Sequence, residues 1–162
     1  MRWVGVLWVG LMLASGARAA KPGCLELAAA GDMAPPALYQ AMDACLAEAK
    51  YDRAADLYAL AGAESAYDTA RVSGAGAREA HTALTKGKLA ALETAARSAL
   101  MVALKSKLAD PAELPKTCAA IAKLGPPRYD PSYLLGAPSS VPPEFEPAAA
   151  WRSALAAYLH CP

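Results

Sequence analysis

Four cysteines constrain this chain more than any other feature of its sequence: Cys24, Cys45, Cys118 and Cys161. An even number of cysteines in an exported protein indicates disulfides, because thiols oxidise outside the cytoplasm. Cys45 and Cys118 each lie on the apolar stripe of an expected helix, whereas Cys24 and Cys161 lie near the two chain ends, which often meet in a folded domain. We therefore expect the pairs Cys45–Cys118 and Cys24–Cys161. The alternative joins sequence neighbours, Cys24–Cys45 and Cys118–Cys161.

The first residues indicate export. Arg2 supplies a positive charge, an apolar run from Trp3 to Leu13 follows, and Ala17-Arg18-Ala19 places small residues at both positions that signal peptidase reads. The apolar run is shorter than the roughly 20 residues that a membrane-spanning helix needs, so a retained N-terminal anchor is the lesser alternative. We expect residues 1–19 to be a signal peptide cleaved near Ala19, and residues 20–162 to be one periplasmic domain without a stable membrane anchor.

The charge balance excludes two classes of partner. Without Arg2 and Arg18, the 16 Lys and Arg residues fall to 14 against 15 Asp and Glu residues, so the mature chain has a net charge of −1. Binding of nucleic acid requires a basic surface, and electrostatic attachment to a membrane requires a basic segment. We expect neither nucleic acid nor a membrane surface as a partner.

Most of the chain repeats its apolar residues at spacings of three and four, which is typical of amphipathic helices. Gly62 either ends a helix or permits a close helix contact, and Gly87 is a weak point between two helices. Short helices are expected at about 24–30 and 65–72, and longer ones at about 35–49, 53–63, 77–86, 89–108, between 110 and 125, and 147–160. No stretch alternates apolar and polar residues as a strand does. We therefore predict an all-α fold, a single compact bundle of five to seven helices tied by the disulfides.

Residues 125–147 hold seven of the 13 prolines and form a long connection between helices. Connections of this length are usually functional or disordered. Because this one contains Tyr129, Tyr133, Leu134 and Leu135, we expect an ordered loop that packs on the helices.

The sequence lacks the patterns that catalysis and metal binding require. His81 and His160 are the only histidines, and cysteines in disulfides cannot act as nucleophiles. The spacings of zinc and calcium sites and the glycine loop that binds phosphate are missing. Glu64 and Asp68, one helical turn apart, could form an acid–base pair, but we expect them on a solvated helix face. We predict no enzyme activity, no metal and no cofactor.

Two groups of residues are candidates for binding a protein partner. Tyrosine and arginine anchor protein interfaces most often, and prolines reduce the entropy that a loop loses on binding. The first group, the helical strip, consists of Tyr67, Asp68 and Arg71; the second, in the proline-rich loop, consists of Arg128, Tyr129, Asp130 and Tyr133. The alternative is that these tyrosines cap the core with their hydroxyls in water.

The segment AEAKYDRAADLYALAGA, within residues 44–72, resembles a tetratricopeptide or Sel1-like helix hairpin. Its resemblance is carried by Tyr51, Ala55, Leu57, Tyr58 and Ala61. Such repeats stack into peptide-binding grooves and need about three units to be stable. No second copy follows at a period of about 34 residues, so we expect one hairpin in a non-repeating bundle.

Three blocks, YALAGAESAYDTARV, AREAHTAL and CAAIAKLGPPRYDPSYL, are similar to small exported helical proteins of Gram-negative bacteria. Some of these act as immunity proteins against secreted effectors such as cell-wall or membrane hydrolases. The resemblance implies a periplasmic protein-binding protein that neutralises such an effector. The alternatives are a Sel1-like scaffold of an envelope complex and a periplasmic carrier of an apolar ligand. The sequence specifies neither the partner's identity nor the oligomeric state.

Overall fold

The computed structural model describes residues 22–72, 76–134 and 141–162, and these ranges contain helices but no strand. The expected signal peptide, residues 1–19, lies outside the described residues. The six α-helices are α1 (Pro35–Ala47), α2 (Tyr51–Arg71), α3 (Ala77–Ala91), α4 (Thr94–Leu108), α5 (Leu114–Ala122) and α6 (Pro147–Leu159), with two 3-10 helices, η1 (Leu27–Ala29) and η2 (Pro131–Leu134). The predicted all-α bundle is confirmed. Among the described helices, none combines the length and the apolar character that crossing a membrane requires.

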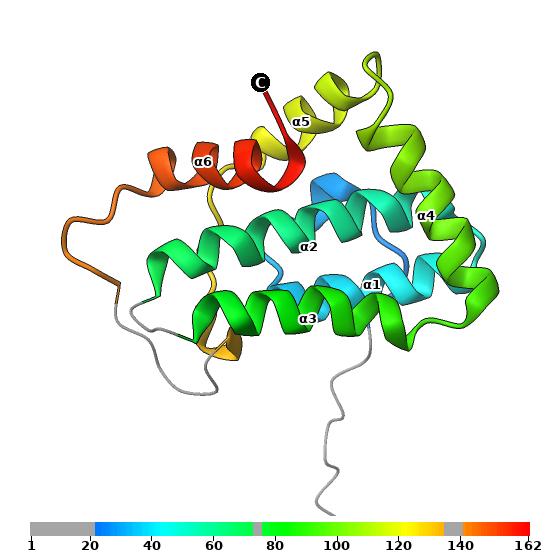
Figure 1. The fold of residues 1–162 in the computed structure, drawn as a ribbon, viewed down its shortest axis with the longest axis horizontal. Coiled ribbons are helices and arrows are strands. Elements are labelled where there is room, and N and C mark those ends of the chain that lie inside the picture. Colours follow the sequence, from blue (N-terminus) through cyan, green and yellow to red (C-terminus); the bar gives the residue numbers. More distant parts are fainter. Residues whose placement is uncertain (1–21, 73–75, 135–140) are drawn as a thin grey trace, which may run out of the picture.

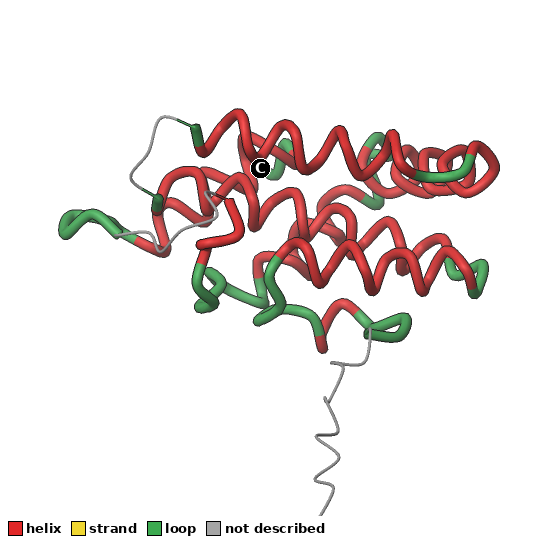
Figure 2. Tube along the Cα trace, turned by 90° about the horizontal axis from the view of Figure 1, so that it is seen from below, coloured by secondary structure: helices red, strands yellow, loops and turns green. Residues whose placement is uncertain are grey.

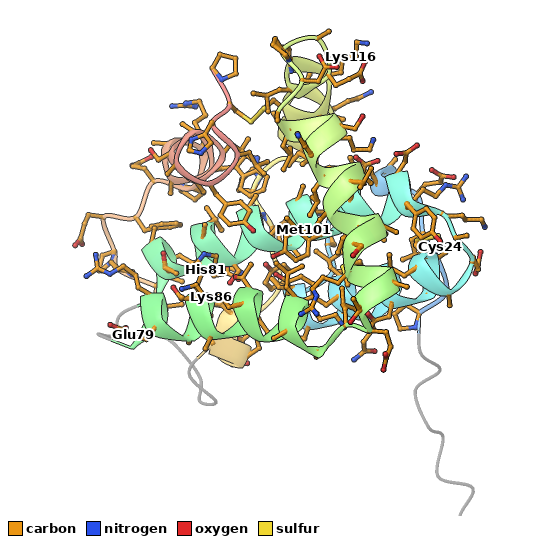
Figure 3. All side chains as sticks on the ribbon, turned by 45° about the vertical axis from the view of Figure 1, so that its right-hand side comes forward. Cys24, Glu79, His81, Lys86, Met101 and Lys116 are labelled. Atoms are coloured by element: carbon orange, nitrogen blue, oxygen red, sulfur yellow. A yellow bond between two sulfur atoms is a disulfide. The ribbon has the colours of Figure 1, made fainter. Side chains whose placement is uncertain are left out.

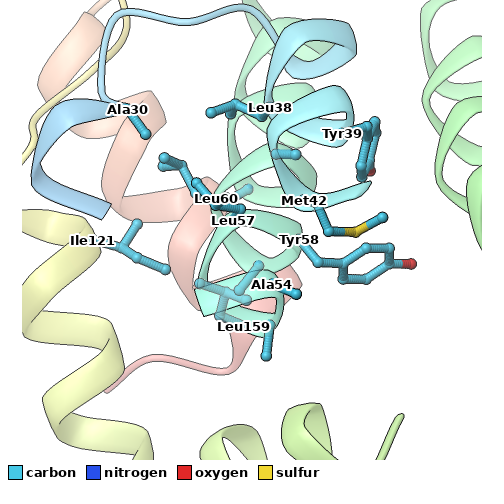
Figure 4. Packing of buried hydrophobic residues seen from close by; sticks show 14 of the residues in the cluster. Ala30, Leu38, Tyr39, Met42, Ala54, Leu57, Tyr58, Leu60, Ile121 and Leu159 are labelled. Carbon is cyan, nitrogen blue, oxygen red and sulfur yellow. The ribbon is translucent and has the colours of Figure 1, made fainter. Parts of the chain in front are cut away.

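Helix α2 is the centre of the bundle. It packs against α1, α3, α4 and α6, which run roughly along it except for α4, which crosses at one end (Figures 1 and 2). Small residues on several faces, including Ala54, Ala55, Ala61 and Ala63, are fully buried and let the neighbouring helices approach closely. The core around α2 brings together leucines from α1, α2 and α6 with Ile121 of α5 (Figure 4). Helix α2 is central because its buried residues lie on several of its sides, so that several helices can pack on it.

Gly62 does not end a helix, so the two expected helices at 53–63 and 65–72 are wrong as separate elements. Helix α2 is continuous from Tyr51 to Arg71. A Cβ atom at Gly62 would overlap the ring of Tyr158 on α6. The glycine therefore serves the other predicted purpose, a close contact between two helices.

The expected boundary at Gly87 is also wrong. Gly87 lies inside α3, and the chain turns instead at Leu92 and Glu93, which adopt extended backbone angles. One glycine costs a helix about 1 kcal/mol, which α3 tolerates. Leu89 in the last turn of α3 and Leu92 in the connection to α4 both pack against the core, and the chain changes direction there.

The disulfides join sequence neighbours. Cys24 is bonded to Cys45, and Cys118 is bonded to Cys161, so the preferred pairing is wrong and the alternative is confirmed. The segment before α1 folds back along that helix and brings Cys24 beside Cys45, while α5 and α6 pack together and bring Cys161 beside Cys118 (Figure 3 labels Cys24). Disulfides of this kind are typical of oxidising compartments such as the periplasm or the extracellular space.

Candidate functional site

The structure joins the helical strip and the proline-rich loop into one polar cluster. Helix α2 places Glu64 and Asp68 one turn apart, facing the loop. Asp68 accepts hydrogen bonds from the hydroxyls of Tyr129 (3.0 Å) and Tyr133 (2.7 Å) and from Nε of Arg71 (2.6 Å). The Tyr129 hydroxyl also lies 3.3 Å from Glu64 Oε2. We call these five residues the carboxylate cluster.

Arg71, in the last turn of α2, is the only cation of the carboxylate cluster. Its guanidinium carbon lies 5.3 Å from the ring centre of Tyr67 and 5.0 Å from that of Tyr129. Both distances are within the range of cation–π attraction. A buried cation is thus held by one carboxylate and two aromatic rings, which fixes the loop on α2.

Burial sets the protonation of the two carboxyls. It raises the pKa of Glu64 to about 9, helped by the neighbouring Asp68 and opposed by the hydrogen bond from Tyr129. Burial also raises the pKa of Asp68, but Tyr133 and Arg71 oppose the rise. Because Arg71 donates to Asp68 and not to Glu64, the negative charge of the pair is favoured on Asp68 and the proton on Glu64.

The tyrosine hydroxyls of the loop stay protonated. Burial, followed by the neighbouring carboxyls, raises the pKa of Tyr129 and of Tyr133 above the ordinary value. Each hydroxyl therefore remains a hydrogen-bond donor toward α2 throughout the physiological range.

The two carboxyls of the carboxylate cluster are closed to solvent. Glu64 is 1% exposed and Asp68 is 0% exposed, so the expectation of a solvated carboxylate pair is wrong. Ser65, 2.9 Å from Nδ1 of His81, is also fully buried, and burial lowers the pKa of that histidine. These groups hold the loop and α3 against α2.

The helical strip is not on the surface, contrary to the sequence-based expectation. Tyr67, Asp68 and Arg71 are buried beneath the loop. The alternative expectation, tyrosine hydroxyls in water, is wrong for Tyr129 and Tyr133, which donate to Asp68. The physical reason is the same for both: the tyrosine hydroxyls of the loop donate to Asp68 of the strip, so each covers the other.

Two of the predicted binding residues are exposed, and each has a contact within the chain. Arg128 donates from Nη2 to Asp32 (3.0 Å), and Asp130 accepts from the backbone of Ser132 (2.9 Å). The role of these residues in partner binding stays a prediction. Part of the proline-rich loop, residues 135–140, lies outside the described residues.

A groove that the sequence interpretation missed lies on the other side of α2. Its volume is about 730 Å³, its floor is α2, and its walls are α4 and α6, with Leu89 of α3 at the margin. We call it the α4 groove. It is lined by Tyr58, Ala59, Leu89, Met101, Val102, Leu104, Lys105, Leu108, Ala109, Tyr158 and Leu159. Lys105 is the only charged residue among them.

The lining includes large apolar side chains that remain in contact with solvent. Met101 is 48% exposed and Val102 is 71% exposed. Figure 3 labels Met101, which lies on α4. A contiguous apolar surface of this kind marks a binding site more often than a solvated face.

The sequence contained a signal for this groove. Residues 99–104, ALMVAL, are all apolar, whereas a helix on the surface of a bundle needs only one apolar stripe. The stripe through Leu100 and Leu104 faces the core, and the surplus, Met101 and Val102, faces outward. Six consecutive apolar residues in one helix therefore predict a second contact surface.

Known proteins provide no further guide to these sites. A scan against protein families, a search of curated proteins and a search of solved structures each find no match for this chain. Within the described residues, no group of three or more potential metal-ligating side chains lies close together.

Glu64→Gln is expected to stabilise the protein at alkaline pH. Because folding raises the pKa of Glu64 from an ordinary value near 4.5 to about 9, stability is greatest below that ordinary value and is lost as the pH rises toward 9. Glutamine keeps the shape and cannot ionise. At pH 8 the free energy of unfolding should exceed that of the unaltered protein by up to about 1.4 kcal/mol for each pH unit above the ordinary pKa, with little change at pH 4.5.

Urea unfolding at the two pH values measures this difference. Glu144→Gln, at an exposed position of the proline-rich loop, is the matched control and should change neither value. An equal effect of Glu64→Gln at both pH values would show that folding does not raise the pKa of Glu64.

Proposed function

We propose that this chain is an exported protein-binding protein that takes an apolar helical segment of its partner into the α4 groove. The observation that carries the proposal is the groove itself, an apolar surface with α4 and α6 as its walls and α2 as its floor. The two disulfides support a place in an oxidising compartment, and the N-terminal sequence favours the periplasm.

The shape of the groove supports a helical occupant. A groove between α4 and α6 on the floor of α2 occupies the position of one further helix in the bundle, and amphipathic helices commonly bind in such grooves. Methionine adapts its shape to different apolar partners, which suits Met101 at the margin. The groove is open to solvent along α4, so a segment can enter without unfolding the bundle.

The partner that the resemblance favours is a toxic effector or a hydrolase of the cell wall or membrane. Inhibition of such an enzyme requires a rigid surface and no chemistry of the inhibitor's own. The carboxylate cluster supports this, because its ionisable groups hold the loop in place on α2. A Sel1-like scaffold of an envelope complex uses the same groove with a partner that has no enzyme activity.

Replacement of Val102 tests the proposal. Val102→Glu places a charge at an exposed apolar position of the groove and should reduce capture of the partner from an envelope extract by about tenfold or more. Val141→Glu makes the same change at an apolar position that is 47% exposed and outside the groove lining, and should leave capture intact. Mass spectrometry of the captured proteins measures both. Equal capture by the two variants contradicts the proposal.

A carrier of an apolar small molecule is the second candidate, favoured by the size of the groove. A volume of about 730 Å³ falls within the range of small-molecule sites, and the lining is mostly apolar. The neutral fluorophore N-phenyl-1-naphthylamine distinguishes the two candidates. Saturable binding that Val102→Glu abolishes, together with a lipid retained through purification, favours the carrier. Protein capture without either result favours the protein-binding function.

A further inference from the structure

The charges on α4 are one-sided. Between Thr94 and Leu108 this helix has three cationic residues, Arg97, Lys105 and Lys107, and no acidic residue. Lys107 is paired with Asp56 at 2.9 Å. Across the described ranges, Arg97 and Lys105 form no ion pair; Lys105 is exposed and Arg97 is half-buried.

Lys105 lies at the margin of the α4 groove, and Arg97 lies one helical turn beyond the groove residue Met101. Arg97, Met101 and Lys105 follow one another at spacings of four, which places them in one row on the helix surface. Met101 and Lys105 line the groove, and Arg97 continues the row by one turn. At 1.5 Å per residue, the two cations are separated by about 12 Å along the axis.

Helix stability accounts for only one of them. Lys105 lies in the last turn of α4, where the helix dipole favours a positive charge. Arg97 lies in the first turn, where the dipole disfavours one. Glu93, the N-cap residue of α4, lies four residues before Arg97, but the two side chains form no ion pair in the described part of the chain, which leaves the guanidinium open to a ligand.

We propose that the segment bound in the groove is an amphipathic helix with acidic side chains along one flank, about two turns apart, that pair with Arg97 and Lys105. This inference rests on the proposed function. The apolar face of the segment packs on Tyr58, Leu104 and Leu159, and its acidic flank runs along α4. The ion pairs fix the orientation of the segment and speed its association, whereas the apolar contacts supply most of the affinity.

Two matched peptides serve as probes. Each is a fluorescent helix of about 18 residues with the same leucine and alanine face, one with two glutamates and the other with two lysines on the same flank, about two turns apart. Fluorescence anisotropy measures their binding to the complete protein. The acidic peptide should bind at least about tenfold more tightly than the basic peptide at low salt, with a smaller difference at high salt.

Reversing the two charges on the protein tests whether Arg97 and Lys105 recognise the acidic flank. Arg97→Glu with Lys105→Glu should reverse the order of the two peptides. Lys86→Glu with Lys123→Glu, at exposed positions outside the groove, is the matched control and should preserve it. Circular dichroism verifies that each variant is folded.

The outcomes separate this inference from the function on which it rests. Equal binding of both peptides, unchanged by reversal at Arg97 and Lys105, overturns the acidic flank and leaves the groove as an apolar helix site. Binding of neither peptide overturns the helix-binding groove, and the proposed function with it.

Discussion

Asp68→Asn is expected to destabilise the protein by about 3–5 kcal/mol, although asparagine has nearly the same shape as aspartate. The substitution leaves the guanidinium of Arg71, which is 6% exposed, buried without a counter-charge. It also removes the charged acceptor of the hydroxyls of Tyr129 and Tyr133. Urea unfolding at pH 7 measures the loss.

A double-variant cycle shows whether the loss comes from the unpaired cation. Removing both charges, with Asp68→Asn and Arg71→Met, should cost less than the sum of the single substitutions, because no buried charge is then left unpaired. Asp32→Asn is the control: it breaks the exposed pair with Arg128 and should change stability little. A loss of equal size at Asp32 and Asp68 would contradict the role of Asp68 as the counter-charge of a buried cation.

Removal of the Cys118–Cys161 disulfide is expected to cost about 4 kcal/mol. The bond closes a loop of 43 residues, and the unfolded chain regains the entropy of that loop when both cysteines are replaced by alanine. Removal of Cys24–Cys45, which closes 21 residues, should cost about 3 kcal/mol. Thermal and urea unfolding of the two double variants measure both values.

The two disulfides should also differ in their effect on the α4 groove. Cys161 follows Tyr158 and Leu159, which line the groove, whereas Cys24 and Cys45 lie outside its lining. Loss of the Cys118–Cys161 bond should therefore weaken binding in the groove more than loss of Cys24–Cys45. Equal stability losses combined with equal binding would show that neither loop length nor position determines what each bond does.

Helix α2 connects the two sites that the structure defines. Glu64 and Asp68 on one side of α2 hold the proline-rich loop, while Tyr58 and Ala59 on another side form the floor of the groove. Gly62, between these positions, sets the distance to α6 through its contact with Tyr158, which lines the groove. A rigid α2 therefore supports a fixed groove, as an inhibitor or binding protein requires.

The sequence alone determined the features that depend on neighbours along the chain. The spacing of leucine and alanine predicted the helices, and the even number of cysteines predicted two disulfides. Both follow from local chemistry, since residues three and four apart share a helix face whatever lies opposite. The same reasoning placed a helix boundary at Gly87 instead of Leu92. The position of that turn depends on the packing of Leu89 and Leu92 against the core, which the sequence pattern does not show.

Only the tertiary structure decided which faces meet solvent and which cysteines meet one another. The sequence pattern predicted that Glu64 and Asp68 lie on a solvated helix face. In the structure they are covered by Tyr129 and Tyr133, which lie more than 60 positions away in the sequence. The cysteine pairs depended on how the segment before α1 and the end of α6 fold back, and the groove depended on the crossing of α4 over α2. Periodicity assigns side chains to a face, but burial of that face depends on contacts between elements far apart in sequence.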